Sequence, residues 1–192
     1  MSDRNFELKT SLSVNGQHFE QVQYVLKDAI VSLVMGKVLV YIPKHDSNFL
    51  VDKNAKKLIK VDISQQLAQV SQAKPLLGAF SIKTTQQSEE IAGLTSKHIV
   101  VNSYVNSPIQ ISADIYYTAH PGLAETSWPA FVAYEQRTRF FSLELGADDL
   151  ITRIHIETTV NGTVQIQTVE LVSLKNVFIP KELNEYINYS IY

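Results

Sequence analysis

The sequence predicts a mainly β (α+β) fold: a strongly curved antiparallel sheet or half-barrel with one or two covering helices. Segments in which apolar and polar residues alternate follow one another along most of the 192-residue chain. This period of two is typical of antiparallel strands with one solvated face. Two Asn-Gly pairs, Asn15-Gly16 and Asn161-Gly162, separate such segments. This dipeptide favours the positive φ angles of a tight hairpin turn.

The N-terminal third is expected to be a hairpin followed by shorter strands. Phe6, Leu8 and Leu12 share one face of the first strand, and the second strand, at residues 18–27, carries Tyr24 on one face. Turn-forming residues separate the next apolar segments. We therefore expect strands at residues 29–35, 38–42, 48–52 and 58–62.

A first helix is predicted at residues 64–73, which are rich in Gln and Ala. Asp62 and Gln65 have the spacing of a capping box, and Pro75 and Gly78 are expected to end the helix. Apolar residues recur around it at helical spacing: Ile63, Leu67, Val70 and Leu77.

Further strands are predicted at residues 80–86, 97–104 and 109–117, and a second helix follows. Ser127 is expected to cap this helix, with Pro129 in its first turn and Gly146 beyond its end. Its inner stripe is Trp128, Phe131, Glu135, Thr138, Phe141 and Leu145. The second Asn-Gly pair joins strands at about 150–160 and 163–174, and Pro180 introduces a polar tail. No spacer divides the chain, so we expect one domain over residues 1–192.

Composition excludes several classes of function. The chain has 17 Lys and Arg against 19 Asp and Glu, and this balance argues against nucleic-acid binding. It has no cysteine, which excludes disulfides, thiolate metal sites and a Cys nucleophile. No apolar stretch approaches the ~20 residues of a transmembrane helix. The N-terminus lacks the apolar run of a secretory signal, so the sequence as it stands predicts a cytoplasmic protein, or a periplasmic one if a signal peptide has been removed.

No motif in the sequence indicates a catalytic or metal site. The five histidines have no metal-ligand spacing, and the nucleophile-elbow, P-loop and dinucleotide patterns are absent. We expect no metal and no cofactor. Asp114 and His120, or a tyrosine, are the candidates for acid–base chemistry if the protein is an enzyme.

Three stretches resemble the LolA/LolB-like superfamily of lipoprotein carriers and its small relatives. Residues 38–42 through 49–58 are similar to a pair of strands that ends in an Asp-turn-Lys hairpin. Residues 90–100 resemble the "Ile-Ala-Gly-Tyr" entry of a strand, with Leu94 in place of the usual Tyr. The run from Ile151 through the second Asn-Gly pair to residues 179–183 resembles the terminal hairpin and "Ile-Pro" exit. The resemblance implies a half-barrel whose helices line or plug an apolar mouth. The residues with which such carriers pass their cargo to a partner protein have no clear counterpart in this sequence, so no residue is assigned that role.

These observations predict a hydrophobic-ligand carrier. The apolar strand faces exceed what the helices can cover, and aromatic residues gather at 116–141. Such residues suit a concave apolar site that holds an acyl chain or another apolar small molecule. The residues expected to line it are Leu8, Leu12, Tyr24, Ile111, Ile115, Tyr117, Trp128 and Phe131.

Two other functions fit the same sequence. A metal-free, non-redox isomerase or cyclase would use the same cavity to orient an apolar substrate and would need only one or two acid–base groups. A scaffold would pair through an exposed sheet edge and bind no ligand. A strongly perturbed ionisable group inside the cavity would favour the enzyme, and a sealed core would favour the scaffold.

Overall fold

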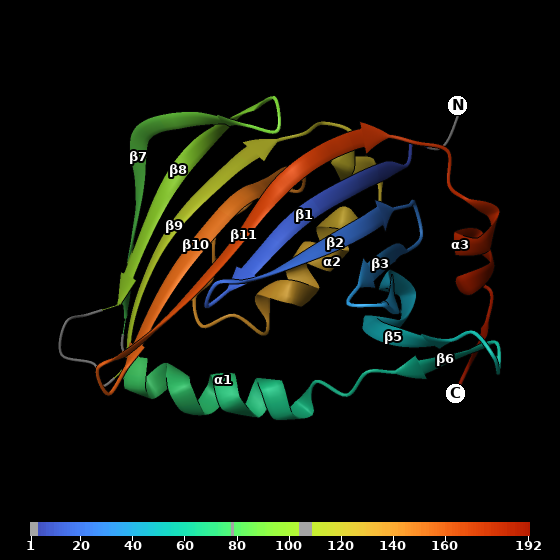
Figure 1. Ribbon diagram of the computed structural model, residues 1–192, viewed down its shortest axis with the longest axis horizontal. Helices are drawn as coiled ribbons and strands as arrows, with labels where there is room; N and C mark the ends of the chain where they lie inside the picture. The colour runs from blue at the N-terminus through green and yellow to red at the C-terminus, as the bar shows by residue number, and fades with distance from the viewer. Residues whose placement is uncertain (1–3, 78, 104–108) are drawn as a thin grey trace.

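The computed structural model describes residues 4–77, 79–103 and 109–192, and the strands within them form one sheet. In chain order the strands are β1 (Phe6–Val14), β2 (Gln17–Val25), β3 (Ile30–Val34), β4 (Lys37–Ile42), β5 (Ser47–Asp52), β6 (Lys57–Lys60), β7 (Phe80–Ile91), β8 (Leu94–Ser103), β9 (Ile109–Ala119), β10 (Asp149–Val160), β11 (Thr163–Asn176) and β12 (Ser190–Ile191). Across the sheet the order is β12-β6-β5-β4-β3-β2-β1-β11-β10-β9-β8-β7, and all neighbouring pairs are antiparallel except β12 with β6. The sheet curves without closing on itself (Figure 1), which confirms the predicted fold class.

Both Asn-Gly pairs form the predicted hairpin turns. Asn15 and Gly16 have φ angles of 48° and 83°, and Asn161 and Gly162 have 50° and 81°. Two consecutive positive φ angles define the turn that matches the right-handed twist of the flanking strands. The first turn joins β1 to β2 and the second joins β10 to β11.

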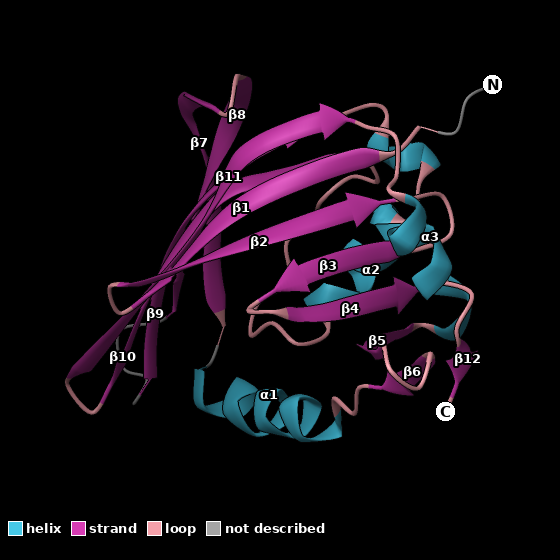
Figure 2. Ribbon diagram, turned by 45° about the vertical axis from the view of Figure 1, so that its right-hand side comes forward, coloured by secondary structure: helices cyan, strands magenta, loops and turns pink. Residues whose placement is uncertain are grey.

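Three helices accompany the sheet in the described residues: α1 (Ser64–Leu77), α2 (Trp128–Gln136) and α3 (Lys181–Tyr186). Figures 1 and 2 show α1 running below the sheet, while α2 and α3 lie on opposite faces of β3 and β4. Two short 3-10 turns, at Pro43–His45 and Leu123–Glu125, complete the elements. No helix in these described ranges is long and apolar enough to cross a membrane.

The helices differ from the sequence prediction at their ends. α1 continues through Pro75 instead of ending there. Three positions of the prediction lie outside what the structure describes. They are Gly78, expected to end this helix, the side chain of Leu77, and Tyr104, expected to end a strand. α2 ends at Gln136, ten residues before Gly146. The chain beyond it is not helical because Phe141 and Leu143 alternate inward and pack on the inner face of β8, β9 and β10.

Ser127 does not cap α2, which corrects the sequence prediction. Its side chain makes no cap hydrogen bond. Instead its hydroxyl lies 2.7 Å from the carbonyl oxygens of both Leu26 and Ala29. The hydroxyl of Thr126 accepts the hydrogen bond from the Trp128 N–H, at 3.1 Å. Ser127 therefore ties the start of the helix to the β2–β3 connection.

β3 and β4 are buried on both faces. Ile30 and Tyr41 belong to the cluster beneath α2, whereas Val31 and Val40 belong to the cluster beneath α3. Burial on both faces explains why residues 29–42 form a nearly continuous apolar run rather than an alternating one.

The segment after Pro180 is structured and is not only a polar tail. Leu183 and Tyr186 of α3 are buried against the outer face of β3 to β6. The chain then adds β12 to the sheet edge, where the Tyr192 N–H donates to the carbonyl oxygen of Leu58 at 2.9 Å.

Candidate functional site

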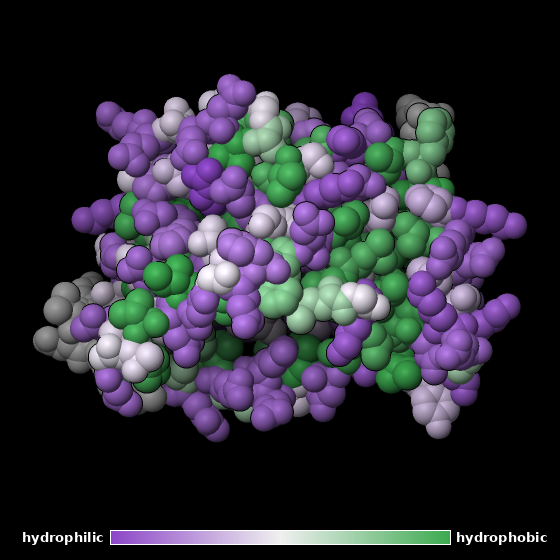
Figure 3. Space-filling view, viewed as in Figure 1, coloured by the Kyte–Doolittle hydropathy of each residue, from purple (hydrophilic) through white to green (hydrophobic). Residues whose placement is uncertain are grey.

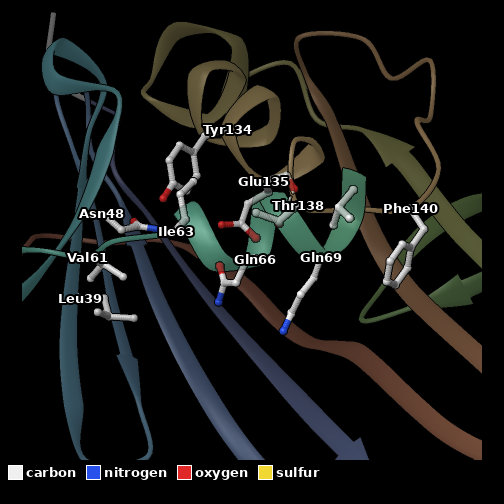
Figure 4. Close-up of a pocket in the computed structure, with 11 residues that line it drawn as sticks. Leu39, Asn48, Val61, Ile63, Gln66, Gln69, Tyr134, Glu135, Thr138 and Phe140 are labelled. Atoms are coloured by element: carbon white, nitrogen blue, oxygen red, sulfur yellow. Dashed lines mark hydrogen bonds between the residues drawn. The ribbon is translucent and has the colours of Figure 1, made fainter. Parts of the chain in front are cut away.

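A pocket of about 470 Å³ lies between α1, α2 and the inner face of β4 and β5. The surface is hollowed above α1 in the space-filling view (Figure 3), and Figure 4 shows the side chains around the hollow. The residues that line it are Leu39, Asn48, Val61, Ile63, Gln66, Gln69, Val70, Tyr134, Glu135, Thr138 and Phe140.

Apolar side chains come to the pocket from each of its walls. Leu39 belongs to β4 and pairs with Leu50 of β5 on the inner face of the sheet. Val61 and Ile63 lie in the short connection from β6 to α1, and Phe140 lies beyond the end of α2. Each wall of the pocket therefore carries some apolar surface.

Polar side chains occupy the α1 and α2 sides. Gln66 and Gln69 lie one turn apart on α1, so both face the same direction. Tyr134 hydrogen-bonds to Asn48, and the Thr138 hydroxyl donates to the carbonyl oxygen of Glu135 at 3.0 Å. Apart from Glu135, these hydrogen-bonding groups of the wall are uncharged at neutral pH.

Glu135 is the acidic residue of the pocket wall, and its carboxyl is largely removed from water. Burial raises the pKa of Glu135 above its ordinary value, and the positive charge of Arg139 offsets this in part. Burial lowers the pKa of Arg139, and Glu135 offsets that shift in turn. Nη1 of Arg139 is buried and has no hydrogen-bond partner among the described residues.

The eight residues predicted to bind a ligand line other parts of the interior. Leu8 and Trp128 are buried in the cluster beneath α2, and Phe131 packs against it. Ile111 and Ile115 belong to the cluster on β8–β10, and Tyr117 packs against that cluster. Tyr24 packs against the cluster beneath α3. Leu12 is half-buried on β1. None of the eight lines the 470 Å³ pocket. Ile111 also borders a smaller hollow of about 210 Å³.

The candidate acid–base residues Asp114 and His120 do not meet. Asp114 Oδ1 lies 3.1 Å from Nε2 of His98 on the outer face of the sheet. His120 follows the end of β9, and its ring packs edge-on against Phe6 with centroids 5.2 Å apart. Six residues of extended chain, about 20 Å, separate the two. Neither borders the pocket.

His98 is part of a cross-strand network on the outer face. Its Nδ1 lies 3.0 Å from the hydroxyl of Thr85, and its ring stacks on Tyr116 at 4.5 Å. Arg153 lies over the other side of Tyr116 and pairs with Glu170 at 2.6 Å. This network joins β7 to β11, and its residues border neither the 470 Å³ pocket nor the 210 Å³ hollow. No cluster of three or more metal-ligating side chains occurs among the described residues.

Three sequence patterns contained pocket residues that the prediction did not select. The stripe assigned to the second helix includes Glu135 and Thr138, and the helical spacing around residues 64–73 includes Ile63 and Val70. The aromatic segment at 116–141 includes Tyr134 and Phe140. Leu39, Asn48 and Val61 gave no signal of their own. They meet the helices only because β4, β5 and the β6–α1 connection turn under α2.

No protein-family model and no curated protein matches the chain. Among solved structures, an outer membrane lipoprotein-sorting protein domain from Vibrio parahaemolyticus is 8% identical with a TM-score of 0.35, covering 96% of this chain and 90% of that one. The Pseudomonas aeruginosa MucA/MucB complex is 11% identical with a TM-score of 0.48, and the match covers 95% of this chain and 55% of that one. PNGF-II is 16% identical with a TM-score of 0.48, and the match covers 98% of this chain and 30% of that one.

The chain therefore spans only 30% of PNGF-II and about half of MucB. The matching structures include a lipoprotein-sorting protein domain. At these identities and TM-scores the likeness does not extend to function.

Proposed function

We propose that this protein binds a small molecule with an apolar chain in the pocket between α1, α2 and β4–β5, and acts as a carrier. The observation that carries the proposal is the pocket itself. Its volume of about 470 Å³ lies within the ~300–1,000 Å³ range of small-molecule sites. Its walls combine apolar side chains with a few convergent hydrogen-bonding groups, which is the usual composition of such sites.

Burial of an acyl chain supplies enough free energy for useful binding. Each buried CH₂ contributes about 0.8 kcal/mol, so eight of them contribute roughly 6 kcal/mol. Ordering of the ligand and loss of its translational freedom reduce this gain. A free energy of about 6 kcal/mol corresponds to a dissociation constant of tens of micromolar before these costs, so we expect values from about 0.1 mM into the millimolar range for simple amphiphiles.

The residues predicted from sequence have a supporting role in this proposal. Phe131 packs against Tyr41 with ring centroids 5.4 Å apart, one turn before Tyr134 on the same helix. Trp128 lies one turn earlier and donates through Nε1 to the carbonyl oxygen of Asp149 at 2.9 Å. These contacts hold α2 against the sheet and so fix the position of the wall.

Titration with the neutral dye Nile red tests the proposal. The dye should bind saturably, with enhanced emission, and a ten-carbon alcohol should displace it. Leu39→Asp should weaken dye binding at least about tenfold, because the ligand would have to desolvate a carboxylate on the apolar wall. Leu50→Asp is the matched control, since Leu50 pairs with Leu39, is also half-buried and does not line the pocket.

Equal affinity of the two folded variants would contradict the proposal, as would the absence of saturable dye binding to the unmodified protein. Circular dichroism identifies a variant that has not folded. In that case Leu39→Asn and Leu50→Asn give the same comparison without a charge.

A further inference from the structure

We propose that the ligand's polar group is uncharged and hydrogen-bonding, such as a hydroxyl, amide or ester, and that Glu135 excludes an anionic group. This inference rests on the proposed function and names the chemical class of the ligand. It separates a fatty alcohol or amide from a free fatty acid, which has the same chain and differs only at the polar end.

The first support is the set of polar side chains on the wall. Asn48, Gln66, Gln69 and Thr138 each provide both a donor and an acceptor and carry no charge. Among the described residues that line the pocket there is no Lys, Arg or His. Sites for carboxylates and phosphates rely on such cations for charge-assisted hydrogen bonds. This wall instead suits a group that both donates and accepts.

The second support is the direction of the Glu135 side chain. Figure 4 shows its carboxyl pointing into the hollow between Gln66 and Thr138. An anion bound there would face a like charge in a region largely removed from water, where such repulsion is poorly screened.

Arg139 limits the opposite possibility, a cationic ligand. It follows Glu135 by four residues, does not line the pocket and already offsets part of the carboxyl's charge. An ammonium group entering the pocket would therefore meet a partly compensated carboxylate and would lose its own hydration.

The experiment compares four ten-carbon ligands that differ only in the polar group: decanol, decanamide, decanoate and decylammonium. Each competes with Nile red at about pH 8 and below its aggregation concentration. Decanol and decanamide should bind at least about tenfold more tightly than decanoate, a difference of about 1.4 kcal/mol. In Glu135→Gln, decanoate should bind to within about threefold of decanol, both measured in the same variant.

Several outcomes would overturn this inference without touching the proposed function. Decanoate binding as tightly as decanol would do so, as would decylammonium binding tightest, because Glu135 would then be a counter-ion. An unchanged preference in Glu135→Gln would show that the carboxyl does not select. Arg139→Met completes the set, because loss of decanoate binding in this variant alone would identify Arg139 as an anion site. Failure of all four ligands and of the dye would instead contradict the proposed function.

Discussion

Truncation of Ile115 distinguishes a packed core from a second lining surface on β8–β10. Ile115 is fully buried, with Ile99 and Ile154 as its strand partners and with Phe141 and Leu143 in the same cluster. In a packed site, Ile→Ala loses both transfer free energy and contacts around the new cavity, which together cost about 2–5 kcal/mol. Domains of this kind are stable by about 5–15 kcal/mol, so most of the variant should remain folded.

Urea denaturation followed by circular dichroism measures this loss. With an m-value of about 2 kcal/mol/M, the midpoint should fall by roughly 1–2.5 M while the slope stays unchanged. Nile red affinity of the folded variant should be the same as that of the unmodified protein, because Ile115 does not line the pocket. A loss below about 1 kcal/mol together with altered dye affinity would refute this reasoning and would place the ligand against β8–β10.

Three further predictions follow from individual contacts. Gly122→Ala should lower the free energy of unfolding by about 1–3 kcal/mol in a thermal melt, since the new Cβ would lie 2.6 Å from Cζ of the buried Phe6 ring. The double variant with Phe6→Leu should lose less than the sum of the two single variants. Glu135→Gln should stabilise the protein in urea at about pH 8, because its raised pKa makes the charged form costly in the folded state. That gain should vanish below about pH 4, as the carboxyl becomes protonated in the unfolded state as well. Burial raises the pKa of Tyr41 to about 12. Stability should therefore fall by up to about 2.7 kcal/mol between pH 10 and 12, and Tyr41→Phe should lack this component of the loss.

The fold was predictable because local rules and tertiary packing agree along most of this chain. The Asn-Gly pairs specify turns through backbone sterics alone. β1 and β9 are buried mainly on one face, so apolar and polar residues alternate along them in the sequence. Prediction failed where a long-range contact replaced the local one. Ser127 bonds to carbonyls about 100 residues earlier in the chain, and Phe141 packs on strands instead of extending a helix.

The pocket was less predictable because its residues come from elements that look ordinary one at a time. Gln66 and Gln69 are exposed on a polar helix, so in the sequence they resemble ordinary solvated residues. The apolar strand faces that suggested a cavity, such as that of Ile111 and Ile115, are instead covered by residues 141–145. The prediction of an apolar excess assumed that only helices can cover a sheet.

The packing of residues 141–145 on β8–β10 also explains why the pocket lies between α1, α2 and β4–β5. The chain after α2 covers β8–β10, so α2 itself is left to cover β1–β4, and α1 spans the space between the two covers. α1 contributes few apolar side chains to this packing. Val70 is buried, and Ala73 packs against the β8–β10 cluster. The glutamines of α1 cannot fill an apolar space without losing their hydrogen bonds to water. The gap between α1 and the sheet therefore keeps both apolar side chains, such as Leu39 and Val61, and hydrogen-bonding groups, such as Asn48 and Gln66. A ligand with an apolar chain and one uncharged polar end would satisfy this arrangement.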